Sequence, residues 1–240
     1  MTRLPAGVSF GGSLLLAGAI VLSRYCRKFA LQIERRWHAF SAGVAVAYVF
    51  VSIMPELEEH RSAVAESTLG ALLDTEKRIY LWALAGFVAF GGLSRLRCVP
   101  VSGLRRPGWL YSGTVLGYAL YVLLIGYLLV LREDASVLSL ALYVFAIGLH
   151  LFMVDSELAE QFQHRYESGG RWVLVGCAPL GWALGIAGAF PDSVTSRLFA
   201  FLAGGVLITA VHAEVRAEEG PRFWWFVGGS AAYATILMLI

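Results

Sequence analysis

The sequence predicts an all-α integral membrane protein with eight transmembrane helices. Its composition is the first observation: 58% of the 240 residues are hydrophobic, 15% are charged, and the mean hydropathy is +0.68. A soluble domain of this length carries more charge on its surface. The second observation is that apolar runs of about 18 to 22 residues, long enough to cross a bilayer, recur along the chain. We expect one polytopic transmembrane domain over residues 1–240.

The first four expected spans cover residues 7–23, 39–56, 79–95 and 109–131. The first lacks a small-residue cleavage site, so we expect it to be retained and not removed as a signal peptide. The second closes on Pro55, which ends or kinks a helix. Basic residues flank the third span. The fourth contains no His, Asp, Glu or Cys, and therefore offers no metal ligand of these types.

The last four expected spans cover residues 136–160, 172–190, 195–215 and 223–240. The fifth is the most polar, and the seventh carries a histidine and a glutamate near its end. Tryptophans stand at several predicted span ends, as in the aromatic belts of membrane proteins. These tryptophans are Trp37, Trp109, Trp172, Trp224 and Trp225.

The distribution of charge predicts the orientation of the spans. Thirteen of the nineteen Lys and Arg residues fall on one side of the eight spans, Arg171 among them. Basic residues concentrate in cytoplasmic loops, so both termini are expected outside. The membrane itself is expected to be a plasma membrane or a bacterial inner membrane. A formal net charge of +2 gives no indication of nucleic-acid binding, and a homo-oligomer stays open.

Two distant segments are near-copies of each other. Phe40-Ser41-Ala42-Gly43 opens span two, which ends in acidic residues, and Phe201-Leu202-Ala203-Gly204 opens span seven, which ends at Glu214. In the expected topology these spans run in opposite directions through the membrane. The pattern predicts an inverted repeat of spans one to three and six to eight, with spans four and five between them, as in secondary transporters.

Span five holds the strongest polar signal inside the membrane. His150, Glu157 and His164 are spaced seven residues apart and share a helix face. Asp155 lies roughly 140 degrees round the helix from His150. Histidine and carboxylate ligands suit zinc, iron or manganese, and the same residues suit a proton relay. The alternative is that only His150 is deep, and that Glu157 and later residues reach the headgroups.

Two further groups are candidates. His212 and Glu214 in span seven suit a second ion site or a gate, whereas ion pairing at the interface explains the charges beyond Glu214. The acidic residues after Pro55, from Glu56 to His60, suit an outer collector of cations or a solvated loop with no such role.

The two F-x-A-G spans resemble helices of the ZIP (Zrt/Irt-like) family of divalent-metal transporters. Residues 39–44 and 52–56 resemble the family's second helix, which closes on H-L-L-P-E, and residues 201–214 resemble its seventh helix, which ends on a glutamate. The resemblance implies eight spans, outward termini and metal ligands on the fourth and fifth helices. His150 is the residue that it carries over to this chain as a ligand.

This chain departs from the family at the other ligand positions. The family's fourth-helix pattern H-x-x-x-E-G aligns with residues 121–126, which places Tyr121 and Ile125 at the ligand positions. On the fifth helix Val154 stands where the family has a glutamate, with Asp155 one residue further. One imidazole does not hold a transition metal without further ligands.

Three functions remain open from the sequence. The first is transport or binding of a divalent cation (Zn, Fe or Mn) at a reduced site of His150, Asp155 and Glu157, with His212 and Glu214 further in. The second is a membrane binding, sensing or scaffold protein of the same fold without transport. The third is an intramembrane metal-dependent hydrolase that uses His150, Asp155 and His212, although no H-E-x-x-H motif is present.

Overall fold

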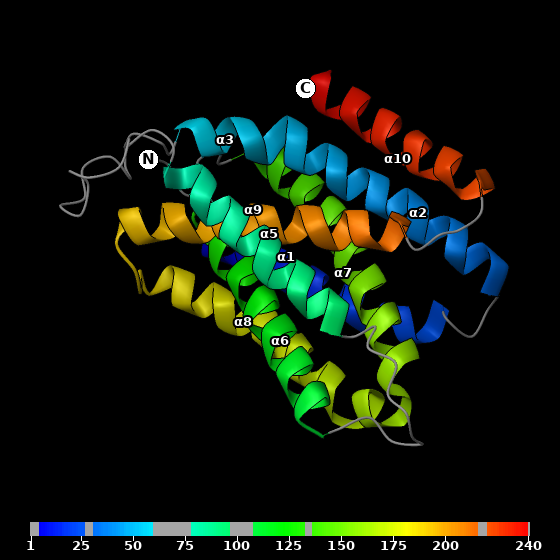
Figure 1. Cartoon of the computed structure of the whole chain (residues 1–240). Coiled ribbons are helices and arrows are strands. Elements are labelled where there is room, and N and C mark those ends of the chain that lie inside the picture. Colours follow the sequence, from blue (N-terminus) through cyan, green and yellow to red (C-terminus); the bar gives the residue numbers. More distant parts are fainter. Residues whose placement is uncertain are drawn as a thin grey trace. The chain divides into compact units, whose positions relative to one another are not determined.

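The computed structural model describes residues 5–26, 31–59, 78–96, 108–132, 136–215 and 220–239. Within these ranges the secondary structure is helical, and no strand occurs (Figure 1). The helices in chain order are α1 (Ala6–Cys26), α2 (Leu31–Tyr48), the π-helical η1 (Val49–Ile53), α3 (Met54–Glu59), α5 (Arg78–Leu96), α6 (Gly108–Val130), α7 (Val137–Arg165), the π-helical η4 (Tyr166–Gly170), α8 (Arg171–Ile186), α9 (Asp192–Val215) and α10 (Gly220–Met238). The prediction of an all-α protein is confirmed.

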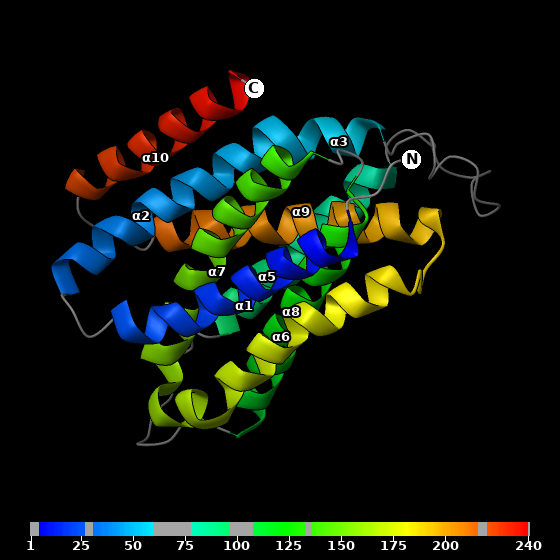
Figure 2. The ribbon, with the colours of Figure 1, turned by 180° about the vertical axis from the view of Figure 1, so that it is seen from behind.

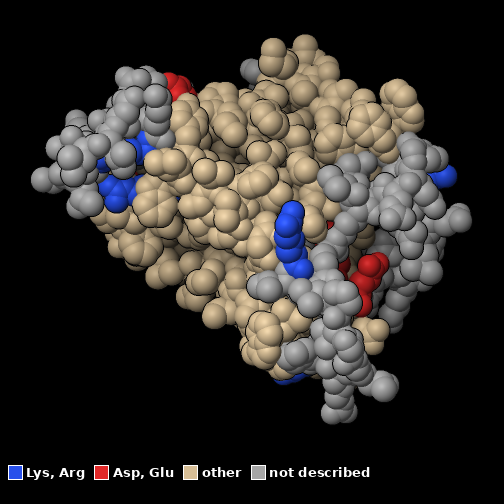
Figure 3. Space-filling view, viewed as in Figure 1, with Lys and Arg blue, Asp and Glu red and all other residues tan. Residues whose placement is uncertain are grey.

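Several of these helices have the length and composition of membrane spans. Among the described residues, five helical segments are long and apolar enough to cross a bilayer, namely Ala6–Tyr25, Arg36–Glu58, Gly108–Val130, Val137–Ile186 and Asp192–His212. Phe223–Met238 is a shorter apolar helix. Large apolar side chains are exposed, and the described surface in Figure 3 is mostly uncharged. Exposed apolar surface on this scale suits contact with lipid.

Pro55 does not end its helix. The chain continues from α2 through η1 into α3, and the Met54 N–H bonds to the Val49 carbonyl, five residues back. A proline lacks the N–H of an ordinary helical bond, and its ring clashes with the carbonyl four residues earlier. A single π turn placed before the proline relieves that conflict.

The connection between the fifth and sixth expected spans differs from the prediction. A loop was expected near residues 161–171, but α7, η4 and α8 form one helical run that changes direction at Gln163. The polar residues in this segment include Gln, Glu and Arg, which are good helix formers, so polarity alone does not make the segment a loop.

The chain forms two compact units, each assembled from distant parts of the sequence. The first unit consists of Met1–Arg35 and Gly92–Ala187, and so contains α1, α6, α7, η4 and α8. The second consists of Arg36–Gly91 and Gly188–Ile240, and contains α2, η1, α3, α5, α9 and α10.

In the first unit, α1 packs against α7 and α8, and α6 packs against α8. The α6–α8 contact is close because a glycine faces backbone. A β-carbon at Gly126 would collide with the carbonyl oxygen of Ala178. Such approaches are typical of helix pairs in membranes, where small residues bring backbones together.

In the second unit, α2 and α10 meet through the first F-x-A-G segment. A β-carbon at Gly43 would collide with the Phe226 carbonyl oxygen, and one at Gly229 would collide with the Phe40 carbonyl oxygen. Further along the same pair, Tyr48 lies against Tyr233, with ring centroids 6.4 Å apart. The two helices therefore run in the same direction.

The helices α5 and α9 of the second unit meet in the same way through the second F-x-A-G segment. A β-carbon at Gly204 would collide with the Ala83 carbonyl oxygen, and one at Gly86 would collide with the Phe201 carbonyl oxygen. In each pair, the phenylalanine carbonyl of the F-x-A-G segment thus faces a glycine of the neighbouring helix, and the glycine of the segment faces a carbonyl of that helix. Figures 1 and 2 also show that α2 and α9 run in opposite directions.

Candidate functional site

Helix α7 carries two fully buried polar side chains, His150 and Asp155. A separation of five residues turns them roughly 140 degrees apart on the helix, as the spacing predicts. They therefore face different neighbours, and each has its own set of contacts. Both sets lie within the first unit.

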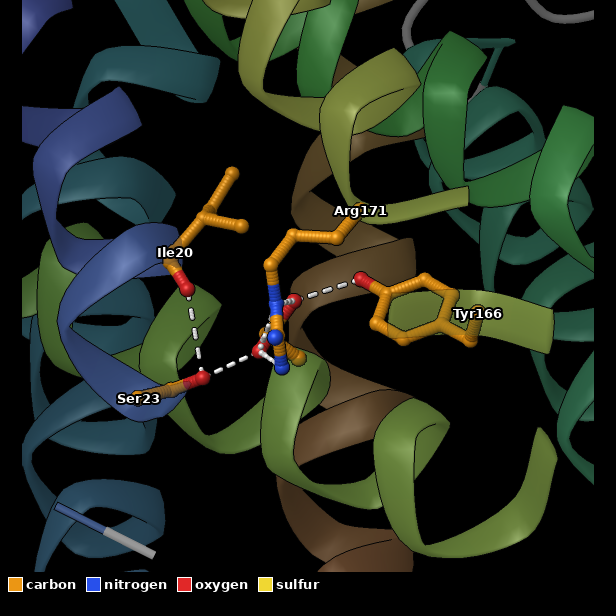
Figure 4. Close-up of polar contacts among 5 residues, drawn as sticks. Ile20, Ser23, Tyr166 and Arg171 are labelled. Atoms are coloured by element: carbon orange, nitrogen blue, oxygen red, sulfur yellow. Dashed lines mark hydrogen bonds and ion pairs between the residues drawn. The ribbon is translucent and has the colours of Figure 1, made fainter. Parts of the chain in front are cut away.

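Asp155 binds the guanidinium of Arg171, which begins α8 and is also buried (Figure 4). Arg171 Nη2 lies 2.7 Å from Asp155 Oδ2, and Nε lies 3.0 Å from Oδ1 and 3.1 Å from Oδ2. The pair is thus held by charge-assisted hydrogen bonds to both carboxylate oxygens, which are the strong class of such bonds.

Two hydroxyl groups complete the surroundings of Asp155. Tyr166 of η4 donates a hydrogen bond to Oδ1 at 2.6 Å, and Ser23 of α1 bonds to Oδ2. Ser23 Oγ also lies 3.2 Å from the carbonyl oxygen of Ile20. These contacts, which we call the Asp155 cluster (Ile20, Ser23, Asp155, Tyr166 and Arg171), join α1, α7, η4 and α8 (Figure 4).

The change of direction at Gln163 makes the Asp155 cluster possible. Arg171 is 16 residues after Asp155, and a straight α-helix would carry it about 24 Å away along the axis. Gln163 has φ 46° and ψ −132°, a backbone conformation outside the helical region, and the chain turns back there. Tyr166 and Arg171 then return to the level of Asp155.

The charge of the Asp155 cluster argues against a divalent cation at Asp155. The carboxylate and the guanidinium neutralise each other, and both carboxylate oxygens already accept hydrogen bonds. A metal ion would have to displace a buried guanidinium or remain beside its positive charge. Leaving a buried charge without its partner is costly, so the ion pair protects Asp155 from coordination.

His150 bonds to Tyr121 of α6. Its Nε2 lies 2.9 Å from the Tyr121 hydroxyl oxygen, and both side chains are fully buried. These are the two positions at which the ZIP resemblance expects ligands from the fourth and fifth helices, and the structure places them together. The chemistry is different, because a phenol replaces one ligand and the buried apolar residues Ile125 and Val154 replace two others.

The remaining predicted residues differ in burial. Glu157 is half-buried on α7, and His164 is exposed beyond the break at Gln163. His212 is half-buried on α9, which belongs to the second unit. The side chain of Glu214 and all of His60 lie outside the described residues.

At the end of α3, Glu58 is exposed and accepts a hydrogen bond from Tyr80 at 2.6 Å, while Glu56 is half-buried. Among the side chains that the structure describes, no three His, Cys, Asp or Glu residues gather closely enough to hold a metal ion. Within the first unit, the predicted ligands His150 and Asp155 therefore lie in separate groups of contacts.

Sequence reasoning missed Arg171, Tyr166 and Ser23. Arg171 was counted with the basic residues of a cytoplasmic loop, but it lies in helix α8, where its side chain is 1% exposed and paired with Asp155. The available signal was weak: an arginine directly before the apolar run that begins at Trp172, with an aspartate 16 residues earlier. The two residues can meet only if the chain reverses its direction between them.

Comparison with known proteins does not identify the chain. No protein-family model matches it, and no curated protein matches it either. The assignment of function therefore rests on the site and on the arrangement of the helices.

Proposed function

We propose that the chain is a ZIP-like membrane protein of eight spans that serves as a non-transporting scaffold or sensor, without a resident transition metal. One observation carries this proposal: the carboxylate of α7 that lies nearest to the family's ligand position is already neutralised by Arg171. Transport of a divalent cation needs exchangeable ligands with net negative charge, and the Asp155 cluster supplies neither.

The contacts within each unit support the inverted repeat in this proposal. Spans two, three, seven and eight correspond to α2, α5, α9 and α10. A repeat that relates span two to span seven and span three to span eight therefore relates the α2–α10 contact to the α9–α5 contact. Both contacts bring a glycine against the phenylalanine carbonyl of an F-x-A-G segment. The same relation turns the α6–α8 pair of the first unit into the α7–α1 pair, and both pairs pack closely. We propose outward termini and a plasma or bacterial inner membrane on the sequence argument alone.

The experiment is uptake of Zn²⁺, Fe²⁺ and Mn²⁺ into proteoliposomes that contain the full chain. We expect uptake equal to that of empty liposomes, and no rise in melting temperature with any of the three ions, because a ligand of the native state must stabilise it. Metal uptake by the wild-type chain would overturn the proposal.

A second candidate is divalent-cation transport through the reduced site, which the convergence of Tyr121 and His150 favours. Two side chains from α6 and α7 meet there, as metal ligands would. His150→Ala would then abolish uptake. The ion would not change the contribution that Arg171 makes to folding. Uptake that is lost in His150→Ala would establish this candidate in place of the first.

A further inference from the structure

An arginine and several aromatic side chains lie at one end of the α2–α10 pair in the second unit. Arg36 and Trp37 lie near the start of α2, and Phe223, Trp224 and Trp225 lie near the start of α10. Because the two helices run in the same direction, both starts lie at the same end of the pair (Figures 1 and 2). All five side chains are exposed, and we call them the Arg36 patch.

The Arg36 patch lies where two apolar helices begin. The apolar segments of this pair are Arg36–Glu58 and the shorter Phe223–Met238, so the first residue of each segment belongs to the patch. Tryptophan and arginine are typical of the boundary between a membrane and water, because their apolar parts lie among acyl chains while their polar ends reach the headgroups. In a pair that crosses a bilayer, the patch would lie at the depth of the lipid phosphate groups.

The Arg36 patch offers a positive charge and hydrogen-bond donors. The Arg36 guanidinium lies over the Trp225 ring, 5.9 Å from the ring centroid, and contacts no carboxylate among the described residues. A contact with a ring face uses no hydrogen-bond acceptor, so the N–H donors of Arg36 stay available. The indole N–H groups of the three tryptophans are further donors, and none of the five side chains is a hydrogen-bond acceptor.

We propose that the Arg36 patch binds an anionic phospholipid, whose phosphate accepts hydrogen bonds from Arg36 and whose acyl chains lie against the exposed indole rings. A phosphate group matches the planar fork of arginine donors and neutralises the arginine's charge. A zwitterionic lipid brings its own cation close to Arg36, so the patch prefers a lipid with net negative charge. This inference goes beyond the proposed function and does not depend on it.

The test is native mass spectrometry of the full chain in detergent, with phosphatidylglycerol or phosphatidylcholine added at equal concentration. We expect the wild type to retain phosphatidylglycerol in preference, and excess inorganic phosphate not to displace it, because phosphate lacks the acyl chains. Arg36→Gln should weaken phosphatidylglycerol binding about tenfold, since hydrogen bonds to a charged group are the stronger class. Trp225→Leu should weaken it less, about threefold, because the guanidinium remains but loses its ring.

The matched control is Arg95→Gln. Arg95 is an exposed arginine near the end of α5, on the same side of the membrane in the proposed topology, and it contacts no aromatic ring among the described residues. Both glutamine variants lose one positive charge, so a general attraction of anionic lipid falls equally in both. We expect Arg95→Gln to keep the wild-type preference. Because Arg36 and Arg95 are both exposed, their replacement leaves the fold intact.

Equal retention of the two lipids by the wild type would overturn the inference, as would equal weakening in Arg36→Gln and Arg95→Gln. Displacement of the lipid by inorganic phosphate would also overturn it, since the patch would then bind free anions. A wild-type dimer that Arg36→Gln converts to a monomer would assign the patch to a second copy of the chain. Failure of this test leaves the proposed function standing, because metal uptake is measured separately.

Discussion

Tyr121 is the residue at which this chain departs most plainly from a metal site. Its hydroxyl oxygen lies 2.9 Å from His150 Nε2, where the resemblance expects a second histidine. A buried phenol and imidazole can satisfy each other by one hydrogen bond, and such a bond stabilises the native state by about 1 kcal/mol net. The local geometry for two facing side chains is present, but their chemistry suits packing better than coordination.

A single substitution tests how close this geometry is to a metal site. Histidine is shorter than tyrosine, so Tyr121→His leaves space between two imidazoles for an ion with bonds of about 2 Å to each. We expect Zn²⁺ to raise the melting temperature of Tyr121→His and to leave that of the wild type unchanged. Tyr118→His on the same helix is the control, and an equal response of both variants would contradict the prediction.

At the scale of the helix, the break at Gln163 decides which residues reach the interior. Gln163 is exposed and has a positive φ, which an L-residue other than glycine adopts at a cost of about 1 to 3 kcal/mol. The strain persists because the hydrogen bonds of Tyr166 and Arg171 to Asp155 hold the returning chain in place.

Glycine at this position should relieve the strain. We expect Gln163→Gly to stabilise the protein by about 1 kcal/mol, because glycine adopts positive φ freely. Glu160→Gly, three residues earlier within regular helix, should destabilise by about 1 kcal/mol. Denaturant titration in detergent measures both, and a destabilised Gln163→Gly would contradict the account of the break.

The F-x-A-G helices provide a second test at the scale of the element, with adjacent glycines on α10. A β-carbon at Gly229 collides with the Phe40 carbonyl oxygen, whereas one at Gly228 meets nothing within 4 Å. We expect Gly229→Ala to cost about 1 to 3 kcal/mol by overpacking. Gly228→Ala should be neutral or stabilise by up to about 1 kcal/mol, because alanine lowers the entropy of the unfolded chain. Equal effects at both positions would refute the close α2–α10 contact.

At the scale of the whole molecule, the chain is interleaved: each compact unit combines two stretches that are separated in the sequence. This arrangement limits the possible topologies, because two helices that pack in parallel must cross the membrane in the same direction. The parallel pairs α2–α10 and α5–α9 meet this condition in the proposed eight-span order with outward termini.

Tags at the two ends of the chain test the topology. We expect a protease added to intact cells or right-side-out vesicles to remove both an N-terminal and a C-terminal tag, because basic residues hold the opposite loops inside. In inside-out vesicles both tags should be protected. Protection of one tag and loss of the other in the same vesicles would exclude an even number of spans.

The all-α class and several apolar helices long enough to cross a membrane could be predicted from the sequence, because hydropathy is a local property that each segment carries by itself. The pairing of Asp155 with Arg171 could not be predicted: it depends on a reversal at Gln163, a residue type that gives no signal of positive φ. The same holds for the meeting of Tyr121 with His150, where the sequence supplied both positions but not the bond. The apolar runs thus determined by themselves the all-α class and several helices suited to a membrane. Only the tertiary structure decided that the buried carboxylate is neutralised from within the chain, because contacts between distant residues depend on packing and not on local composition.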